Sequence, residues 1–228
     1  MTGSNIMLLN LRWVLVLATT GICLRAAEAP AGPPADSKPG ELLSGEPDAN
    51  QIWQGAVGEG FGRSAQSLSV EAGASYGVAA FGSIQQHDLA LTSLTYGRML
   101  GGIKGHGHWY RGNFELRAEL FGGSQFSPAD EWVAGLTPHL RYDFATGTRL
   151  VPFVDVGAGV TLTGIREPDL SSIFEFNLQA AVGVHWFFKD NLALTLEARY
   201  MHMSSGGLSS PNPGVNGVLG TVGLSRFF

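Results

Sequence analysis

Cysteine and charge are both scarce in this 228-residue sequence. The single cysteine, Cys23, lies in a predicted secretory signal, so neither a disulfide nor thiol chemistry is expected in the mature protein. Only 14% of the residues are charged and the net charge is -5, which argues against a nucleic-acid partner. No apolar run outside the N-terminal region reaches the ~20 residues of a membrane-spanning helix. Phosphate-binding loops, dinucleotide-binding fingerprints and zinc motifs are missing, so none of these sites is expected.

Glycine, in contrast, is abundant at 32 residues, and hydrophobic residues make up 44% of the chain. Low charge, many glycines and alternating segments fit a β-barrel whose outer face meets lipid. They fit a soluble β-sandwich as well, so composition alone leaves both folds open.

Residues 1–29 are typical of a secretory signal. Arg12 provides the positive flank, Trp13 to Cys23 the apolar core, and Ala27 to Ala29 a small-residue cleavage site. A membrane anchor is the alternative, but the apolar core is too short for one. Residues 30–51 are rich in proline, glycine, serine and acidic residues and lack apolar periodicity, so we expect a disordered linker there.

From Leu68 onward, apolar side chains alternate with polar or glycine residues in one segment after another. Successive side chains of a strand point to opposite faces, so this pattern predicts strands with one apolar face. Each segment is near the ~10 residues that cross a membrane obliquely. Residues 52–228 are therefore predicted to be all-β, an antiparallel transmembrane β-barrel of about eight strands. The expected strands are Leu68–Ala80, Asp88–Leu100, Phe114–Leu120, Leu136–Phe144, Val154–Leu162, Phe174–Trp186 and two more between Ala193 and Phe228. Residues 52–63 are left open between a plug, a lead-in and part of the first strand.

Short and long connections alternate over the second half of the chain. Ala145–Arg149 and Lys189–Asp190 are tight turns, whereas Ser124–Trp132, Gly164–Ile173 and Ser205–Val215 are longer. Outer-membrane barrels have short periplasmic turns and longer extracellular loops. With both termini periplasmic, the strand that ends before the last loop runs outward.

The second face of the strands carries charged and polar side chains that would line the barrel. A small barrel is filled by side chains, and buried charges must be paired. We interpret these residues as a structural network; a proton or ion path is the alternative, which the mixed signs and narrow bore disfavour. The set comprises Glu71, Glu115, Arg117, Glu119, Arg141, Asp143, Asp155, Glu175, Gln179, Glu197 and Arg199. The opposite face, with Phe176, Val182, Leu194 and Leu196, is expected to face lipid.

One of these apolar faces ends on a histidine and a serine. Every second residue from Leu192 is apolar until the chain reaches His202 and Ser204. A base and a nucleophile at i and i+2 of a strand lie side by side, which suits acyl transfer. Ser204 would be the nucleophile and His202 the base. Backbone N–H groups at Gly206 and Gly207 are candidates for an oxyanion hole, since glycine permits unusual backbone angles. The alternative is that both residues simply end a strand.

The other histidines give weaker signals. His106 and His108 lack nearby cysteine or carboxylate partners, so we interpret them as part of a turn and predict no metal site. His139 and His185 have the parity of the barrel interior. His87 is expected to begin a strand.

The C-terminal segment carries a more specific pattern, made of His202, Ser204, Gly207, Leu208 and Pro211–Gly214. In this it resembles the lipid A 3-O-deacylase (PagL) family, outer-membrane barrels similar to acyloxyacyl hydrolases. The family pattern is His-x-Ser-Asn-x-Gly, a short loop with an Asn-Pro-Gly-like turn, and an acidic residue early in the last strand. Two positions depart from it. Ser205 stands in place of the asparagine, and Asn216 in place of the acidic residue.

The resemblance implies an outer-membrane ester hydrolase that removes a 3-O-linked acyl chain from the lipid A of lipopolysaccharide without a cofactor. It also implies that Asn216 is the third catalytic residue. An amide orients an imidazole but supplies no charge, and in one serine protease an Asp→Asn change at this role costs ~10⁴ in rate. From the sequence, Asn216→Asp or Asn216→Glu is therefore expected to raise the rate.

The partners implied are lipopolysaccharide, outer-membrane lipids and the barrel assembly machinery, for which the terminal Phe228 resembles a recognition signature. The oligomeric state is left open, with a homodimer as one alternative. The alternative function is a non-catalytic small outer-membrane barrel with a structural or adhesion role and a degenerate site. Its work would be done by the loops Ser124–Trp132 and Gly164–Ile173.

Overall fold

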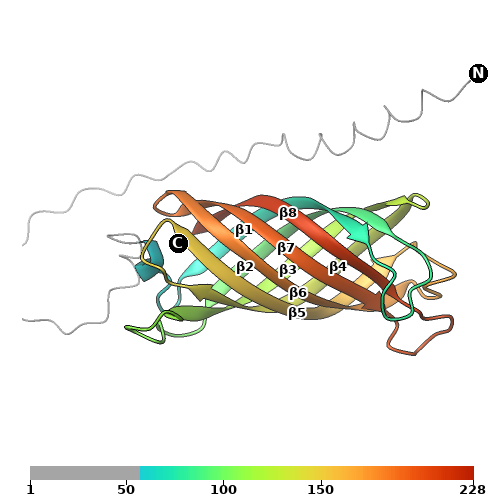
Figure 1. Ribbon diagram of the computed structural model, residues 1–228, viewed down its shortest axis with the longest axis horizontal. Coiled ribbons are helices and arrows are strands. Elements are labelled where there is room, and N and C mark those ends of the chain that lie inside the picture. The colour runs from blue at the N-terminus through green and yellow to red at the C-terminus, as the bar shows by residue number, and fades with distance from the viewer. Residues whose placement is uncertain (1–56) are drawn as a thin grey trace, which may run out of the picture. The chain divides into compact units, whose positions relative to one another are not determined.

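The computed structural model describes residues 57–228, which form a closed antiparallel β-barrel of eight strands (Figure 1). The predicted signal at 1–29 and linker at 30–51 lie outside the described residues. A short 3-10 helix, η2, precedes the barrel at Val57–Gly60. The strands are β1 (Gln66–Gly77), β2 (Asp88–Met99), β3 (Gly112–Ser127), β4 (Glu131–Phe144), β5 (Leu150–Thr163), β6 (Phe174–Lys189), β7 (Leu192–Ser204) and β8 (Val215–Phe227).

Every strand pairs with its neighbour in sequence, and β8 closes the barrel against β1. The connections after β1, β3, β5 and β7 lie at one end, which we call the loop end. The connections after β2, β4 and β6 lie at the other, which we call the turn end. The register places His202 of β7 opposite Asn216 of β8, and Ser204 opposite Phe176 of β6.

Large hydrophobic side chains cover the outside of the barrel. Aliphatic residues occupy the middle, and aromatic residues stand towards both ends, as in barrels that cross a membrane. The predicted outward residues Phe176, Val182 and Leu196 are exposed. Further examples are Val70, Leu94, Leu116, Leu120, Val156 and Val222 in the middle, with Trp132 and Phe174 near the loop end and Trp186 and Phe188 near the turn end. Among residues 57–228, no helix is long and apolar enough to span a bilayer.

The charged residues predicted to line the barrel are all buried inside it. Arg141 bonds to Asp155 at 2.8 Å and to Glu197 at 2.7 Å, and Arg199 bonds to Glu119 at 2.7 Å. His139 lies between Asp155, at 2.6 Å, and Glu119. The hollow beside Arg199 and Glu119 measures only about 10 Å³, too little for a continuous water path. Most of these charges are paired, as the structural interpretation predicts, but both carboxylate oxygens of Asp143 and of Glu175 lack a hydrogen-bond partner among residues 57–228.

The turn end is closed by an apolar cluster. Val57 of η2 and Phe61, which follows it, are buried against Phe187 and Phe227. Asn113 donates a hydrogen bond to the main-chain oxygen of Phe61 at 2.8 Å and fixes the segment there. Of the three alternatives left open for residues 52–63, the described part, 57–63, forms a plug.

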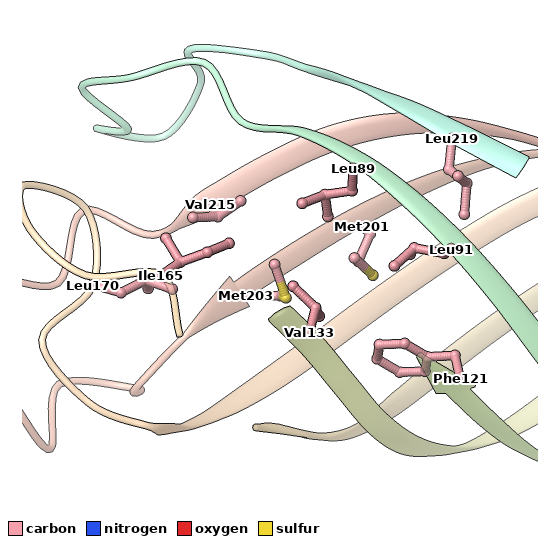
Figure 2. Close-up of a cluster of buried hydrophobic side chains, with 10 residues drawn as sticks. All are labelled: Leu89, Leu91, Phe121, Val133, Ile165, Leu170, Met201, Met203, Val215 and Leu219. Atoms are coloured by element: carbon pink, nitrogen blue, oxygen red, sulfur yellow. The ribbon is translucent and has the colours of Figure 1, made fainter. Parts of the chain in front are cut away.

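The loop end is closed by a second apolar cluster (Figure 2). Ile165 and Leu170 belong to the connection between β5 and β6, at 164–173, and both are buried. Figure 2 shows them beside Met203 and Val215, whose side chains point into the barrel. This connection therefore folds into the mouth of the barrel.

The predicted long loop Ser124–Trp132 is wrong. β3 continues to Ser127, β4 begins at Glu131, and Ser124 pairs directly with Trp132. Only residues 128–130 connect the two strands. The strand was missed because the alternation of apolar and polar side chains stops at Gly122–Ser124, where all three residues are small.

Candidate active site

His202 and Ser204 lie on the outer surface of the barrel, at the loop end of β7. The flanking residues Met201 and Met203 fill the interior, and alternation along the strand turns their neighbours outward. The side chains of His202 and Ser204 are half-buried. A polar pair thus sits on a face that is otherwise apolar.

A chain of hydrogen bonds joins three of the predicted site residues. His202 Nε2 lies 3.0 Å from Ser204 Oγ, and His202 Nδ1 lies 2.8 Å from Asn216 Oδ1. An amide oxygen only accepts hydrogen bonds, so Nδ1 carries the proton and donates it to Asn216. Nε2 of a neutral imidazole is then free to accept the proton of the serine hydroxyl. This is the arrangement that activates a serine nucleophile.

The amide of Asn216 is held in one orientation. Its Nδ2 donates to the main-chain oxygen of Ala80 at 2.8 Å, so Oδ1 must point the other way. Oδ1 also accepts a hydrogen bond from the hydroxyl of Tyr200 at 2.5 Å. Asn216 is only 1% exposed, and both its amide nitrogen and its amide oxygen have hydrogen-bond partners. The sequence had not singled out Tyr200 or Ala80.

Gly214 supports the other side of the imidazole. Its φ of +89° is one that side-chain-bearing residues rarely adopt. A Cβ at this position would lie 2.7 Å from Cε1 of His202. Only glycine therefore lets the chain pass this close to the ring.

Gly206 and Gly207 also have left-handed backbones, with φ of +63° and +86°. Across residues 57–228, their N–H groups donate no hydrogen bond, whereas the N–H of Ser205 is taken by Asn212 Oδ1 at 2.8 Å. The hydroxyl of Ser205, at the position of the family's asparagine, bonds within the loop to Ser209. Two free amides are thus available beside Ser204.

Two open grooves meet at His202 and Ser204. One, of about 510 Å³, leads towards the loops and is lined by Phe81, Tyr200 and Pro213 among others. The second, of about 620 Å³, crosses the outer face of β6, β5 and β4. Its lining is mostly apolar and includes Leu136, Pro138, Ala158, Val160, Phe176 and Leu178. An extended apolar chain fits this second groove.

The remaining histidines lie elsewhere. His106 and His108 are exposed in the turn at 100–111, where His108 stacks on Tyr110. Within residues 57–228 there is no group of three metal-ligating side chains. His139 and His185 are inside the barrel. His87 does not open a strand but precedes β2, where it is buried against Asp169 at 2.9 Å.

The structure therefore brings His202, Ser204 and Asn216 into one chain of hydrogen bonds, with Gly206 and Gly207 in the adjoining loop. Tyr200 lies two residues before His202 and therefore on the same face of the strand, a signal from which its place in the site could have been predicted. The carbonyl of Ala80 comes from a distant connection and has no signature in the sequence.

Two solved structures are similar to this chain. The crystal structure of the outer membrane enzyme PagL is 18% identical, covers 69% of this chain and 97% of its own, and has a TM-score of 0.49. The crystal structure of Neisserial surface protein A (NspA) is 15% identical, covers 72% of this chain and 97% of its own, and has a TM-score of 0.51, a likeness of fold. No curated protein matches the sequence. The family model described as lipid A 3-O-deacylase (PagL) matches residues 75–225. Because that match spans well over half of the chain, the chain belongs to the lipid A 3-O-deacylase (PagL) family.

Proposed function

We propose that this protein is an outer-membrane ester hydrolase that removes a 3-O-linked acyl chain from lipid A by a serine–histidine mechanism. The observation that carries the proposal is the hydrogen-bonded chain Ser204–His202–Asn216 on the lipid-facing surface. The reaction class is inferred from family membership, and the residues that would carry it out are inferred from the geometry of the site.

In the first half of the reaction, Ser204 Oγ attacks the ester carbonyl while His202 Nε2 takes the hydroxyl proton. The negative charge that develops on the carbonyl oxygen is stabilised by the free N–H groups of Gly206 and Gly207. The C–O bond then breaks. His202 returns the proton to the departing sugar oxygen, and the acyl chain stays on Ser204.

In the second half, water attacks the acyl-enzyme and His202 again accepts a proton. The bond between the acyl carbon and Ser204 Oγ then breaks, and His202 returns the proton to Oγ as the fatty acid leaves. Throughout, Asn216 Oδ1 holds the Nδ1–H of His202, which keeps the other ring nitrogen directed at Ser204.

The position of the site fits a lipid substrate. The groove past Ala158 and Leu178 would take the acyl chain, and the groove beside Phe81 and Pro213 opens towards the loops, where a sugar headgroup would lie. With the turn end facing the periplasm, the loop end lies at the outer leaflet, where lipid A is found. The hydrophobic belt and the predicted secretory signal both support an outer-membrane location.

One observation favours a non-catalytic barrel as a second candidate: Asn216 carries no charge to stabilise an imidazolium. The loops expected to serve such a role give it little support. Residues 128–130 are a short turn, and the connection at 164–173 is folded into the barrel mouth.

The experiment is to incubate the purified, folded protein with lipopolysaccharide in detergent and to measure the lipid A by mass spectrometry. The expected product lacks one 3-O-linked acyl chain, and the released fatty acid appears in equal amount. Ser204→Ala and His202→Ala should abolish the change, whereas Ser210→Ala, an exposed loop serine, should not. Heat-modifiable migration on gels checks that each variant is folded. Unchanged lipid A with folded parent protein favours the non-catalytic barrel.

A further inference from the structure

Asp169 is a buried acid that the proposed mechanism does not use. It lies in the 164–173 connection, between the two anchors Ile165 and Leu170 that Figure 2 shows inside the barrel mouth, and is 0% exposed. Its carboxylate accepts hydrogen bonds from the main-chain N–H of Ile84 at 2.6 Å and of Gln85 at 2.8 Å. A buried carboxylate needs such partners to remain charged.

The third partner of Asp169 is His87, which is also buried. Gln125 Nε2 donates to the main-chain oxygen of Ala129, so Gln125 Oε1 faces His87 Nδ1, at 2.6 Å, as an acceptor. Nδ1 of His87 therefore carries a proton. Nε2 lies 2.9 Å from Asp169 Oδ2, whose carboxylate already accepts two N–H groups. Both ring nitrogens of His87 thus have hydrogen-bond partners, and its contact with Asp169 ties the connection at 78–87 to the one at 164–173.

The segment that Asp169 holds leads directly to the site. Within 78–87, Val78 N–H donates to the main-chain oxygen of Asn216 at 2.9 Å, and Ala80 accepts the side-chain N–H of Asn216. Phe81, next in the chain, lines the groove and stands edge-on to Tyr200 with ring centroids 6.4 Å apart. The orientation of Asn216 thus depends on where this segment lies.

Asp169 also contacts the site from the other side. Its main-chain oxygen accepts the N–H of Gly214 at 3.1 Å, and Gly214 is the residue that packs against the ring of His202. One residue therefore fixes both segments that enclose the His202–Asn216 pair.

We propose that Asp169, paired with His87, is a positioning residue for the active site: it acts through Ala80 and Gly214 to hold the imidazole of His202 in the tautomer and orientation that activate Ser204. The kinetic part of this inference rests on the proposed deacylase function. The structural part, the state of His202, does not. A pair that only closed the barrel mouth would leave His202 unchanged.

The test compares Asp169→Ala and Asp169→Asn with Glu167→Gln, an exposed acid two residues away on the same connection. Each folded variant is labelled with 15N-histidine, and the Nδ1–H signal of His202, identified by its loss in His202→Gln, is measured by NMR in micelles. We expect the signal to be lost or split between tautomers in both Asp169 variants and to remain in Glu167→Gln. If Asp169→Ala does not fold, the near-isosteric Asp169→Asn gives the same reading. An unchanged His202 signal in a folded Asp169 variant overturns the proposal.

Kinetics supply the second readout. A misplacement of about 1 Å at a catalytic group can cost ~10²-fold, so kcat for deacylation should fall by about ten- to a hundredfold in the Asp169 variants, with a smaller change in KM. The Asp169 variants keep the main-chain oxygen that binds Gly214 and lose only the side-chain contacts that place the Ala80 segment against Asn216. Their loss should therefore cost little in an Asn216→Ala background. Additive losses in the double variant contradict that route. If the parent enzyme has no activity, the NMR result still decides the role of Asp169.

Discussion

The side-chain nitrogen of Asn216 donates to the main-chain oxygen of Ala80 across 2.8 Å, and this contact decides which atom of the amide faces His202. The site is therefore built around an amide and not around a carboxylate with a missing charge. Ala80, in the connection between β1 and β2, thus fixes the orientation of the Asn216 side chain at the beginning of β8.

This contact reverses the expectation for Asn216→Asp. The sequence alone predicts a faster enzyme, because a carboxylate would stabilise the imidazolium. In the structure, however, the second carboxylate oxygen would meet the carbonyl oxygen of Ala80, and a buried acceptor without a donor costs about 1–3 kcal/mol. We expect Asn216→Asp to lower kcat about tenfold and Asn216→Ala to lower it further, measured by release of fatty acid from lipid A. A faster Asn216→Asp enzyme would show that Ala80 does not constrain the site.

Gly214→Ala should strongly reduce the proposed deacylation without unfolding the barrel. The new Cβ would lie 2.7 Å from His202 Cε1 and push the ring away from Ser204. The expected loss in kcat is about 10²-fold. Gly101→Ala is the matched control, since Gly101 also has a left-handed backbone, with φ of +95°, but has open space around its Cβ position. Equal losses in the two variants would mean that backbone strain, and not the ring contact, is responsible.

Ala158→Trp tests the groove assigned to the acyl chain. Ala158 lines the groove across β5 on the outer face, and an indole there would occupy the space of several methylenes. Because each methylene in an apolar pocket is worth about 1–3 kcal/mol, kcat/KM should fall at least tenfold. Hydrolysis of a short-chain ester should be affected less. Ala72→Trp, on the outer face of β1, controls for the added bulk. Parent-like activity on lipid A would place the acyl chain elsewhere.

Leu196→Arg tests which face meets lipid. Leu196 is exposed at the middle of β7, and an arginine there would have to enter the hydrocarbon. The expected cost in free energy of unfolding is ~2–4 kcal/mol, measured by denaturant titration in lipid vesicles. Trp109→Arg, in the exposed turn at 100–111, should cost much less. A neutral Leu196→Arg would mean that this face is not in the bilayer.

The alternation of apolar residues predicted the parts of the structure that have a local signature. The two faces of most strands and the charged interior followed from parity, because a barrel wall has only an inside and an outside. The exceptions are β2, whose pattern is less regular, and the end of β3 beyond Leu120. The juxtaposition of His202 with Asn216 followed from the pairing of adjacent strands across one loop. These are properties of neighbouring residues or neighbouring strands.

The remaining features depend on contacts between distant segments. His87 looks like an ordinary strand start in the sequence, and its partner Asp169 lies in another connection. Ala80 contributes a backbone oxygen, which every residue type possesses. The extension of β3 was not predicted because residues 122–124 are two glycines and a serine. Without large side chains, these residues show no alternation of apolar and polar positions. Nothing local indicated these features.

Because the barrel is sealed at both ends and filled between them, the second half of the proposed reaction has only one source of water. With the loop end at the outer leaflet, as proposed, the hydrolytic water would arrive past the headgroups, since apolar clusters close both ends of the barrel formed by residues 57–228. His202 and Ser204 sit at the very end of β7, so the wet boundary of the bilayer is within reach while the acyl groove remains in lipid. If the same pair stood two residues deeper along β7, it would keep its geometry and its substrate. It would, however, lie within the hydrocarbon, where the hydrolytic water is not available. The depth of the site, and not only its shape, thus sets whether the acyl-enzyme can turn over.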